Sequence, residues 1–319
     1  MGRPAKRFHE FIGQRRVVEH LRRLIGGAKQ CGDPCTSLLL VGAAGFGKTS
    51  IAKAVAAEYG SNFRCVLASG DTKPAEICAV LRDVRHGDVV LLDEAHALSR
   101  DAQQILYVAL DEWRVPVETK RGISRSENES IAQFTLILAT NEPGGVKQAL
   151  RSRLTRIEFD PYTPAELKAI AEHVAQQSEA SVTPQAANLL AQVAQGSPRV
   201  IARRVQNLKH YWPDGRSITK DHVRNFLTSE GVDEHGFTPH QRTYLRYLAA
   251  LPDRECNVER LAIKLGCDTA NVRQEIEPYL IEQGLVDPTS RQGRGLTEAG
   301  VALIGSLREP NCAESEASP

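Results

Sequence analysis

The chain has 319 residues, a length at which two or three domains are expected. Its formal net charge of +1 excludes a strongly basic nucleic-acid-binding protein, so any DNA contacts would have to come from local patches. Seven scattered cysteines without a C-x-x-C pair favour thiols in a reducing compartment over a metal site or a disulfide framework. No signal region and no apolar run of bilayer length is present, which predicts a cytoplasmic protein without a membrane partner.

Residues 8–30 predict a helix that packs through one apolar stripe, made of Val17, Val18, Leu21, Leu24 and Ile25. A short apolar segment, Phe11 and Ile12, precedes this helix. In a nucleotide-binding fold such a segment either touches the adenine or packs as a staple onto the helix, and the sequence leaves both open.

The strongest motif is a glycine-rich segment at 42–49, Gly-Ala-Ala-Gly-Phe-Gly-Lys-Thr, which matches G-x-x-x-x-G-K-[ST]. An apolar run at 37–41 and an Ala-rich helical pattern at 50–59 flank it, so strand, phosphate-binding loop and helix are expected rather than a glycine-rich turn without a ligand. Lys48 would reach the β- and γ-phosphates and Thr49 would bind Mg²⁺ at the positive end of the helix dipole. The expected nucleotide contacts are Gly42, Gly45, Phe46, Gly47, Lys48, Thr49 and Ser50.

A second motif follows a predicted strand at 65–68 and a predicted helix at 74–84. Residues 88–94, Asp-Val-Val-Leu-Leu-Asp-Glu, read as an apolar strand that ends in two carboxylates, the arrangement called Walker B. Asp93 would hold the Mg²⁺ shell, and Glu94 would position and polarise the attacking water. An apolar strand ending in acids is common, so the assignment depends on the phosphate-binding loop upstream.

The next stretch carries a predicted helix at 102–113 and then loses periodicity between 115 and 131, where an exposed hairpin or loop is expected. A buried strand at 133–139 stops at Thr140 and Asn141. These polar side chains are expected either to reach the γ-phosphate or its water, or to form an ordinary polar strand end.

A short helical turn at 146–150 precedes Arg151 and Arg153, and another strand begins at Arg156. An arginine at an exposed helix end can face the γ-phosphate of a neighbouring subunit and act as an arginine finger. The alternative, a solvated basic turn, is the one that the residues alone favour.

Residues 163–230 predict a wholly helical domain, with a capping box at Thr163 to Glu166, a cap at Thr183 and a helix start at Gly-Ser-Pro-Arg, 196–199. Arg199 lies at a helix start, where the dipole disfavours a cation. A ligand phosphate would remove that mismatch.

Residues 238–307 predict three helices, 238–250, 257–265 and 269–283, followed by two short strands around a loop at 287–294, which is a winged helix. The third helix carries Glu275, Glu277 and Glu282, so the wing residues Arg291 and Arg294 are the expected phosphate contacts. The alternative is a protein-packing module. The tail after Arg308 is Ser- and Glu-rich and is predicted to be disordered.

These motifs occur in one order that resembles the RuvB family, hexameric AAA+ motors that drive Holliday junction branch migration, over about 8–304. The similarity rests on 11–14 (Phe-Ile-Gly-Gln), 42–49, 91–96 (Leu-Leu-Asp-Glu-Ala-His), 134–140, 150–153 (Leu-Arg-Ser-Arg), 196–199 and 291–297. The resemblance implies ATP and Mg²⁺ as cofactors, Thr140 with Asn141 as sensor 1, and Arg199 as the sensor 2 arginine. It also implies Arg151 as the trans finger with Arg153 as second candidate, and nucleotide contacts from Tyr162 and Ile12.

The predicted architecture is therefore α/β: an AAA+ P-loop parallel-sheet domain (1–160), a small helical lid (161–232), a winged-helix DNA-binding domain (233–308) and a tail (309–319). The expected function is an ATP-dependent motor in a homo-oligomeric, hexameric ring that translocates duplex DNA. One alternative is an AAA+ protein that loads a helicase or a clamp, or remodels a protein complex, with the winged helix as a docking module. Another is an ATP-binding switch, which the presence of Glu94 disfavours. Where the family carries an apolar hairpin that docks RuvA, residues 115–131 are charged, so strong binding of RuvA is not expected.

Overall fold

The computed structural model describes residues 7–119, 122–213 and 217–306, and the side chains of 118–126 and 306 also lie outside this description. Its centre is a parallel five-stranded sheet in the order β2-β3-β6-β1-β7. Continuous apolar runs form the inner strands because helices cover both faces of the sheet. The strands are β1 (Leu38–Val41), β2 (Phe63–Leu67), β3 (Val89–Asp93), β6 (Thr135–Thr140) and β7 (Thr155–Glu158).

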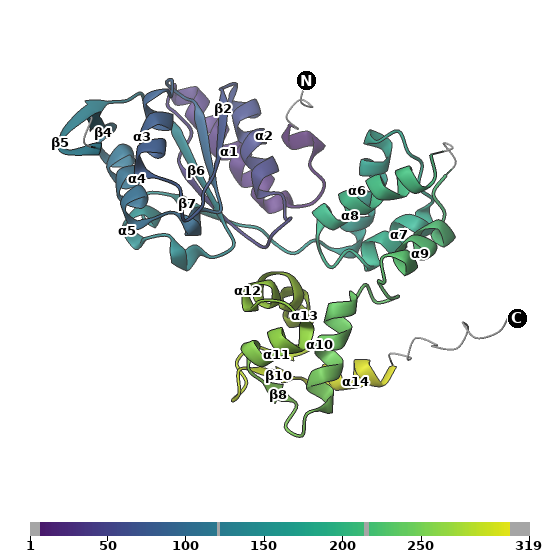
Figure 1. Cartoon of the computed structure of the whole chain (residues 1–319). Helices are drawn as coiled ribbons and strands as arrows, with labels where there is room; N and C mark the ends of the chain where they lie inside the picture. The colour runs from purple at the N-terminus through teal and green to yellow at the C-terminus, as the bar shows by residue number, and fades with distance from the viewer. Residues whose placement is uncertain (1–6, 120–121, 214–216, 307–319) are drawn as a thin grey trace, which may run out of the picture. The chain divides into compact units, whose positions relative to one another are not determined.

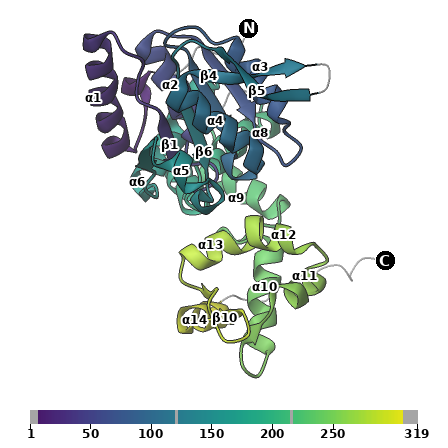
Figure 2. The same ribbon diagram turned by 90° about the vertical axis from the view of Figure 1, so that its left-hand side faces the viewer.

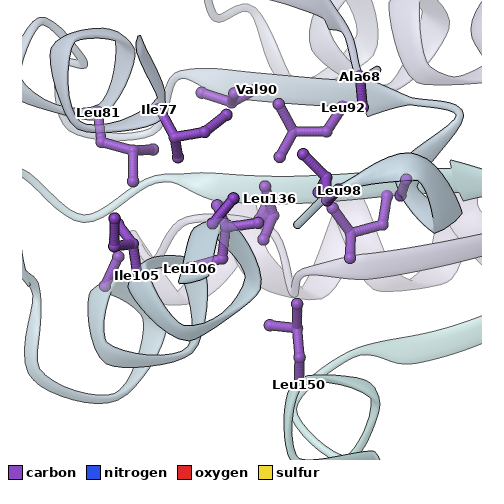
Figure 3. Close-up of a cluster of buried hydrophobic side chains, with 14 of the residues drawn as sticks. Ala68, Ile77, Leu81, Val90, Leu92, Leu98, Ile105, Leu106, Leu136 and Leu150 are labelled. Atoms are coloured by element: carbon purple, nitrogen blue, oxygen red, sulfur yellow. The ribbon is translucent and has the colours of Figure 1, made fainter. Parts of the chain in front are cut away.

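Helices pack on both faces of this sheet (Figure 1). The helices α1 (Arg15–Cys31) and α2 (Lys48–Tyr59) cover one face, and α3 (Pro74–Arg82) and α4 (Arg100–Glu112) cover the other. Side chains alternate along each strand, so Leu38 and Leu40 join the α1–α2 core whereas Leu39 joins the α3–α4 core. Figure 3 shows the α3–α4 core, where side chains of both helices meet Leu92 and Leu136 from the sheet. This confirms the predicted parallel α/β fold.

The aperiodic segment at 115–131 forms a hairpin of β4 (Arg114–Thr119) and β5 (Gly122–Ser130), which extends beside α3 and α4 (Figure 2). Its charged side chains Lys120, Arg121 and Arg125 lie outside the described residues. Glu129 was expected to be exposed, but it is half-buried and pairs with Arg82 of α3. The base of the hairpin is therefore fixed to the domain rather than free in solvent.

The predicted helical stretch consists of α6 (Pro164–Gln177), α7 (Pro184–Gln192), α8 (Pro198–Tyr211) and α9 (Lys220–Ser229). The predicted capping box is present, since Glu166 accepts from the Thr163 N–H at 2.8 Å and the Thr163 hydroxyl accepts from the Glu166 N–H at 3.3 Å. Thr183 caps α7 as predicted. The described chain divides into two compact units, residues up to 173 with 197–203, and 174–196 with 204 onward. Two of the three boundaries, at 173/174 and 203/204, fall inside α6 and α8.

The C-terminal region is a winged helix with a three-stranded antiparallel sheet in the order β8-β10-β9. One predicted helix, 269–283, is instead interrupted by a π-helical turn, Val272–Ile276. Pro278 lacks an N–H and its ring would clash with the preceding turn of a regular α-helix, which explains the wider turn. The elements are α10 (Pro239–Ala250), β8 (Glu255–Cys256), α11 (Val258–Leu265), α12 (Thr269–Asn271), η4 (Val272–Ile276), α13 (Glu277–Glu282), β9 (Val286–Asp287), β10 (Arg294–Leu296) and α14 (Glu298–Ser306).

The predicted tail, 309–319, lies outside the described residues. Within the described part of the chain, no helix combines the length and the apolar character that crossing a membrane would require.

Candidate nucleotide-binding site

The glycine-rich loop joins the end of β1 to the start of α2, as the motif predicts. Lys48 is only 7% exposed, and its Nζ donates hydrogen bonds to the carbonyls of Gly42 at 2.7 Å and Ala43 at 3.0 Å. Burial lowers the pKa of Lys48, and the carboxylates of Glu94 and Asp93 oppose that shift. The loop therefore holds a partly desolvated ammonium group that donates to backbone carbonyls, a group suited to binding a phosphate.

The two predicted metal-binding side chains meet at the carboxyl end of the sheet. Thr49 Oγ1, in the first turn of α2, donates to Asp93 Oδ2 at the end of β3 over 2.7 Å. No group of three or more His, Cys, Asp or Glu suitable for a metal occurs in the described ranges. A hydroxyl with one carboxylate fits Mg²⁺, which keeps several waters and takes further oxygens from substrate phosphates.

The start of α8 lies against the same loop. Gly45 has φ +85°, and a Cβ at this position would lie 2.5 Å from Ser197 Oγ and 3.2 Å from Arg199 Cβ. Only glycine tolerates both this backbone conformation and this contact. Arg199 also lowers the pKa of Lys48 through its charge, a smaller effect than burial. The structure thus brings the predicted sensor 2 arginine to the phosphate-binding loop.

Glu94 follows β3 in a left-handed conformation, with φ 55° and ψ 42°, and opens the short helix η2 (Ala95–Ala97). Its Oε2 lies 3.5 Å from His96 Nδ1, and that nitrogen lies 3.1 Å from Thr140 Oγ1. Thr140 is fully buried, and its Oγ1 also accepts from the Glu142 N–H at 2.9 Å. Asn141 is exposed.

His96 therefore connects the predicted water-activating glutamate to the predicted sensor threonine. The sequence placed His96 inside a recognised motif but assigned it no role. Its position two residues after Glu94 was the only available signal, because the distance to Thr140 depends on the pairing of β3 with β6.

The predicted adenine side is formed by the N-terminal segment and the linker after β7. The Tyr162 hydroxyl donates to the Phe46 carbonyl at 3.1 Å, and burial raises the pKa of Tyr162 to about 12. The Gln14 amide, which the sequence did not single out, donates to the Asp160 carbonyl at 2.6 Å and accepts from the Asp160 N–H at 3.2 Å. These contacts fix the linker beside the loop.

The segment ahead of α1 was expected either to contact adenine or to pack onto the helix, and its two apolar residues differ in this respect. Phe11 packs against the core that contains α1, and its ring centroid lies 6.5 Å from that of Phe8. This favours packing for Phe11. Ile12 is half-buried, and its contact with a base stays a prediction.

The two predicted finger arginines differ in their surroundings. Arg153 donates to Asp111 at 3.1 Å and to the Tyr107 hydroxyl at 2.9 Å, and its guanidinium lies 4.0 Å from the centre of the Tyr107 ring. These internal contacts count against Arg153 as the second finger candidate. Arg151 is half-buried at the end of α5 (Gln148–Arg151), and its Nε has no hydrogen-bond partner among the residues that the structure describes.

The two predicted wing arginines also differ. Arg291 is exposed as expected. Arg294 was expected to contact DNA phosphates, but its Nε donates to both oxygens of Glu277 at 3.0 Å, and its side chain is only 18% exposed. Glu277 itself is buried rather than displayed on the surface of the third helix. The assignment of Arg294 as a DNA contact therefore has to be revised, because its charge is already neutralised inside the winged helix.

Comparisons with known proteins agree with this arrangement. A family model described as the Holliday junction DNA helicase RuvB P-loop domain matches residues 3–158, and one described as the RuvB C-terminal winged helix domain matches 234–305. A Holliday junction branch migration complex subunit RuvB from Saccharopolyspora erythraea is 33% identical over 321 residues, covering 98% of this chain and 90% of its own. One from Kosmotoga olearia is 32% identical over 309 residues, covering 95% and 90%.

A solved structure described as the Thermotoga maritima RuvB Holliday junction branch migration motor has a TM-score of 0.81 at 27% identity, covering 96% of this chain and 99% of its own. A solved point mutant of the same Thermotoga maritima protein has a TM-score of 0.83, covering 94% and 98%. The identity and coverage of these relatives, together with the two matching domain models, show that the chain belongs to the RuvB family.

Proposed function

We propose that this chain is the ATP-hydrolysing subunit of a homo-oligomeric ring, a hexamer, that moves duplex DNA and drives Holliday junction branch migration. As a RuvB family member the chain is an AAA+ ATPase. The observation that carries the proposal is that Lys48, Thr49 and the Asp93–Glu94 pair lie together at the carboxyl ends of the parallel strands. The names of the relatives support the DNA substrate, and a cytoplasmic location follows from it.

The loop residues divide binding between them. Lys48 would exchange its two backbone carbonyl partners for β- and γ-phosphate oxygens of ATP, and Thr49 with Asp93 would hold Mg²⁺. Bound Mg²⁺ would neutralise charge that develops on the phosphate oxygens during transfer. Gly42, Gly45, Phe46, Gly47 and Ser50 are assigned to backbone or first-turn contacts with the phosphates, and Ile12, Tyr162 and Arg199 to the remaining nucleotide contacts.

Hydrolysis needs a water in line with the bond that breaks. Glu94 would orient this water, and Thr140 with Asn141 would report the γ-phosphate. His96 lies within reach of both Glu94 and Thr140, so it would hold the glutamate while the phosphate is present. Arg151 would complete the site of the neighbouring subunit. Hydrolysis would therefore require two adjacent subunits of the ring.

The domain assignment belongs to this proposal. Residues 1–160 would bind nucleotide, 161–232 would form the lid and 233–308 would contact DNA through phosphates, with Arg291 as the remaining wing contact. A second candidate function, protein docking by the winged helix, is favoured by the internal pairing of Arg294 with Glu277. This pairing removes one cation from the expected DNA surface.

One assay tests the proposal against the second candidate: ATP hydrolysis measured with four-way junction DNA, with linear duplex and without DNA. We expect the junction to stimulate turnover most. Labelled junctions should be converted into the separated duplexes that branch migration produces. Glu94→Gln protein serves as the matched control, because it should bind ATP and DNA without turnover. An ATP hydrolysis rate that is the same with junction DNA, with duplex DNA and without DNA would contradict the proposal and leave docking as the function of the winged helix.

A further inference from the structure

Gln103 is a buried polar residue of α4 that the nucleotide site does not use. It is 3% exposed, and its amide makes three hydrogen bonds. Its Nε2 donates to the Leu98 carbonyl at 3.0 Å and to the Gly145 carbonyl at 3.0 Å, while its Oε1 accepts from the Lys147 N–H at 2.7 Å. One side chain thus joins α4, the end of η2 and the segment that leads into α5.

The partners of Gln103 fix both its identity and its orientation. Two carbonyl oxygens require the amide nitrogen and one N–H requires the amide oxygen, so a flipped amide would place like groups together. A glutamate of the same size would direct a carboxylate at two carbonyl oxygens. A methionine would fill the space but make none of the three bonds.

The third bond leads directly to Arg151. Lys147 is the N-cap of α5, and its carbonyl accepts from the Arg151 N–H at 3.0 Å. Lys147 therefore bonds to Gln103 through its N–H and to Arg151 through its carbonyl. Val146 and Leu150 are each 1% exposed in the α3–α4 core, so the segment has little freedom to reorient. Figure 3 shows Leu150 in this core.

The second bond leads toward the nucleotide side. The carbonyl held by Gln103 belongs to Gly145, in η3 (Pro143–Gly145), and a Cβ on Gly145 would lie 2.7 Å from His96 Cβ. His96 contacts both Glu94 and Thr140. A continuous set of contacts therefore runs from Glu94 through His96 and Gly145 to Gln103, and on through Lys147 to Arg151.

We propose that Gln103 is a positioning residue that sets the orientation of Arg151 toward the nucleotide of the neighbouring subunit. This inference rests on the proposed function, because it requires Arg151 to act in trans. It assigns to Gln103 no contact with ATP. A residue of this kind should affect turnover without affecting nucleotide affinity.

The first test compares Gln103→Met with Gln104→Met. Gln104 is the next residue of the same helix and is exposed, so it controls for a methionine in α4. We expect Gln103→Met to bind a fluorescent ATP analogue with unchanged affinity and to lose about a hundredfold in kcat, the loss that a displacement of a catalytic group by about 1 Å can cause. Unchanged kcat would overturn the inference.

The second test uses mixed rings, which separate an effect on the finger from an effect on the subunit's own site. Gln103→Met mixed with Lys48→Ala should regain turnover, because the Lys48→Ala subunit offers an intact Arg151 to the nucleotide of its neighbour. Gln103→Met mixed with Arg151→Ala should stay inactive, because neither subunit offers a correctly set finger. The reversed pattern would show that Gln103 serves its own site and would overturn the inference.

A control pair keeps this result distinct from a failure of the proposed function. Arg151→Ala mixed with Lys48→Ala should regain turnover if Arg151 acts in trans. No rescue in that pair, where rings form, would reject the trans finger and the inference together. Rescue there with the reversed pattern for Gln103→Met would reject only the inference.

Lys147→Pro gives a second route that leaves Gln103 in place. Lys147 has φ −56° and the preceding Val146 has φ −90° and ψ 126°, values that proline and its preceding residue adopt. Proline thus removes the N–H that donates to Gln103, while Lys147→Ala removes only the side chain, which donates to the Arg100 carbonyl at 3.0 Å. Turnover should fall more in Lys147→Pro than in Lys147→Ala. Equal turnover in the two variants would contradict the inference.

Discussion

Arg294 Nε donates to both carboxylate oxygens of Glu277, each at 3.0 Å, and thereby ties β10 of the wing to the start of α13. Glu277 is 1% exposed and also accepts from the Tyr244 hydroxyl at 3.2 Å. A buried carboxylate with three hydrogen bonds is satisfied only while both donors are present. The wing arginine nearest the third helix is therefore part of the interior of the domain.

The first prediction follows from this pair. Arg294→Ala leaves a buried carboxylate without its cation, so it should lower the free energy of unfolding by about 3 kcal/mol. Arg291→Ala, at an exposed position of the same wing, should change it by less than about 0.5 kcal/mol. Urea unfolding of the two variants measures both values. Equal stability of the two would contradict the internal role of Arg294.

The second prediction concerns DNA. Each lost phosphate contact reduces the slope of log Kd against log salt by about one unit. Arg291→Ala should therefore weaken DNA binding and flatten its salt dependence by about that amount, while ATP hydrolysis without DNA stays intact. Fluorescence anisotropy with duplex DNA at several salt concentrations measures the slope. An unchanged slope would favour protein docking by the winged helix.

The third prediction separates binding from turnover. Lys48→Ala should abolish tight nucleotide binding, because it removes the ammonium group that the loop's backbone cradle holds, whereas Glu94→Gln should keep binding and stop turnover. Calorimetric titration with an ATP analogue and a phosphate-release assay measure the two steps. ATP affinity in Lys48→Ala equal to that of the unmutated protein would reject the assignment of the loop.

The fourth prediction concerns pH. Burial raises the pKa of Tyr162 from its ordinary value of 10.0 to about 12, so the folded protein keeps this proton where the unfolded chain loses it. The stabilisation is complete below pH 10 and is lost as the pH rises toward 12, on the order of 3 kcal/mol in total. Between about pH 9 and about pH 11.5, Tyr162→Phe should lose less stability than the unmutated protein. The lower pH lies roughly 1 unit below the unfolded pKa, and the upper pH lies roughly half a unit below the folded pKa. Denaturant midpoints at the two pH values measure this, and parallel losses would show that Tyr162 is not protected.

The fifth prediction concerns the hairpin of β4 and β5. Partner interfaces are anchored by desolvated apolar side chains, and charged side chains are costly to bury. Val115 is fully buried in the domain and Glu129 pairs with Arg82, so neither offers an apolar anchor. Together with the charged sequence of 115–131, this predicts that the protein does not bind a conventional RuvA strongly. Sub-micromolar co-purification with a conventional RuvA, lost in Val117→Asp, would show this prediction to be wrong.

Much of the fold follows from local sequence patterns. The apolar runs of β1, β3 and β6 are too continuous for surface strands, and the phosphate-binding loop fixes its own geometry through glycines and the following helix. The position of Thr49 beside Asp93 could be predicted because Thr49 follows the carboxyl end of β1 and Asp93 ends β3, and the carboxyl ends of both strands lie on the same side of one parallel sheet.

The contacts that could not be predicted depend on tertiary packing. Gln103 and Gln104 are adjacent and chemically identical, yet one is buried with three hydrogen bonds and the other is exposed. Helical periodicity places Gln103 closer than Gln104 to the apolar stripe of α4, but its three hydrogen bonds depend on the path of the segment before α5. Arg294 likewise looked like a free wing cation, since its partner Glu277 lies on a different element.

The left-handed backbone of Glu94 has a consequence for the evolution of this chain. A side chain at φ 55° costs about 1 kcal/mol relative to glycine, so Glu94→Gly would relax the backbone at the same time as it removes the carboxylate. Selection for thermal stability alone would therefore favour the loss of this residue. Among protein variants at position 94 sorted only for resistance to thermal unfolding, glycine should be enriched, whereas sorting for ATP hydrolysis should retain glutamate.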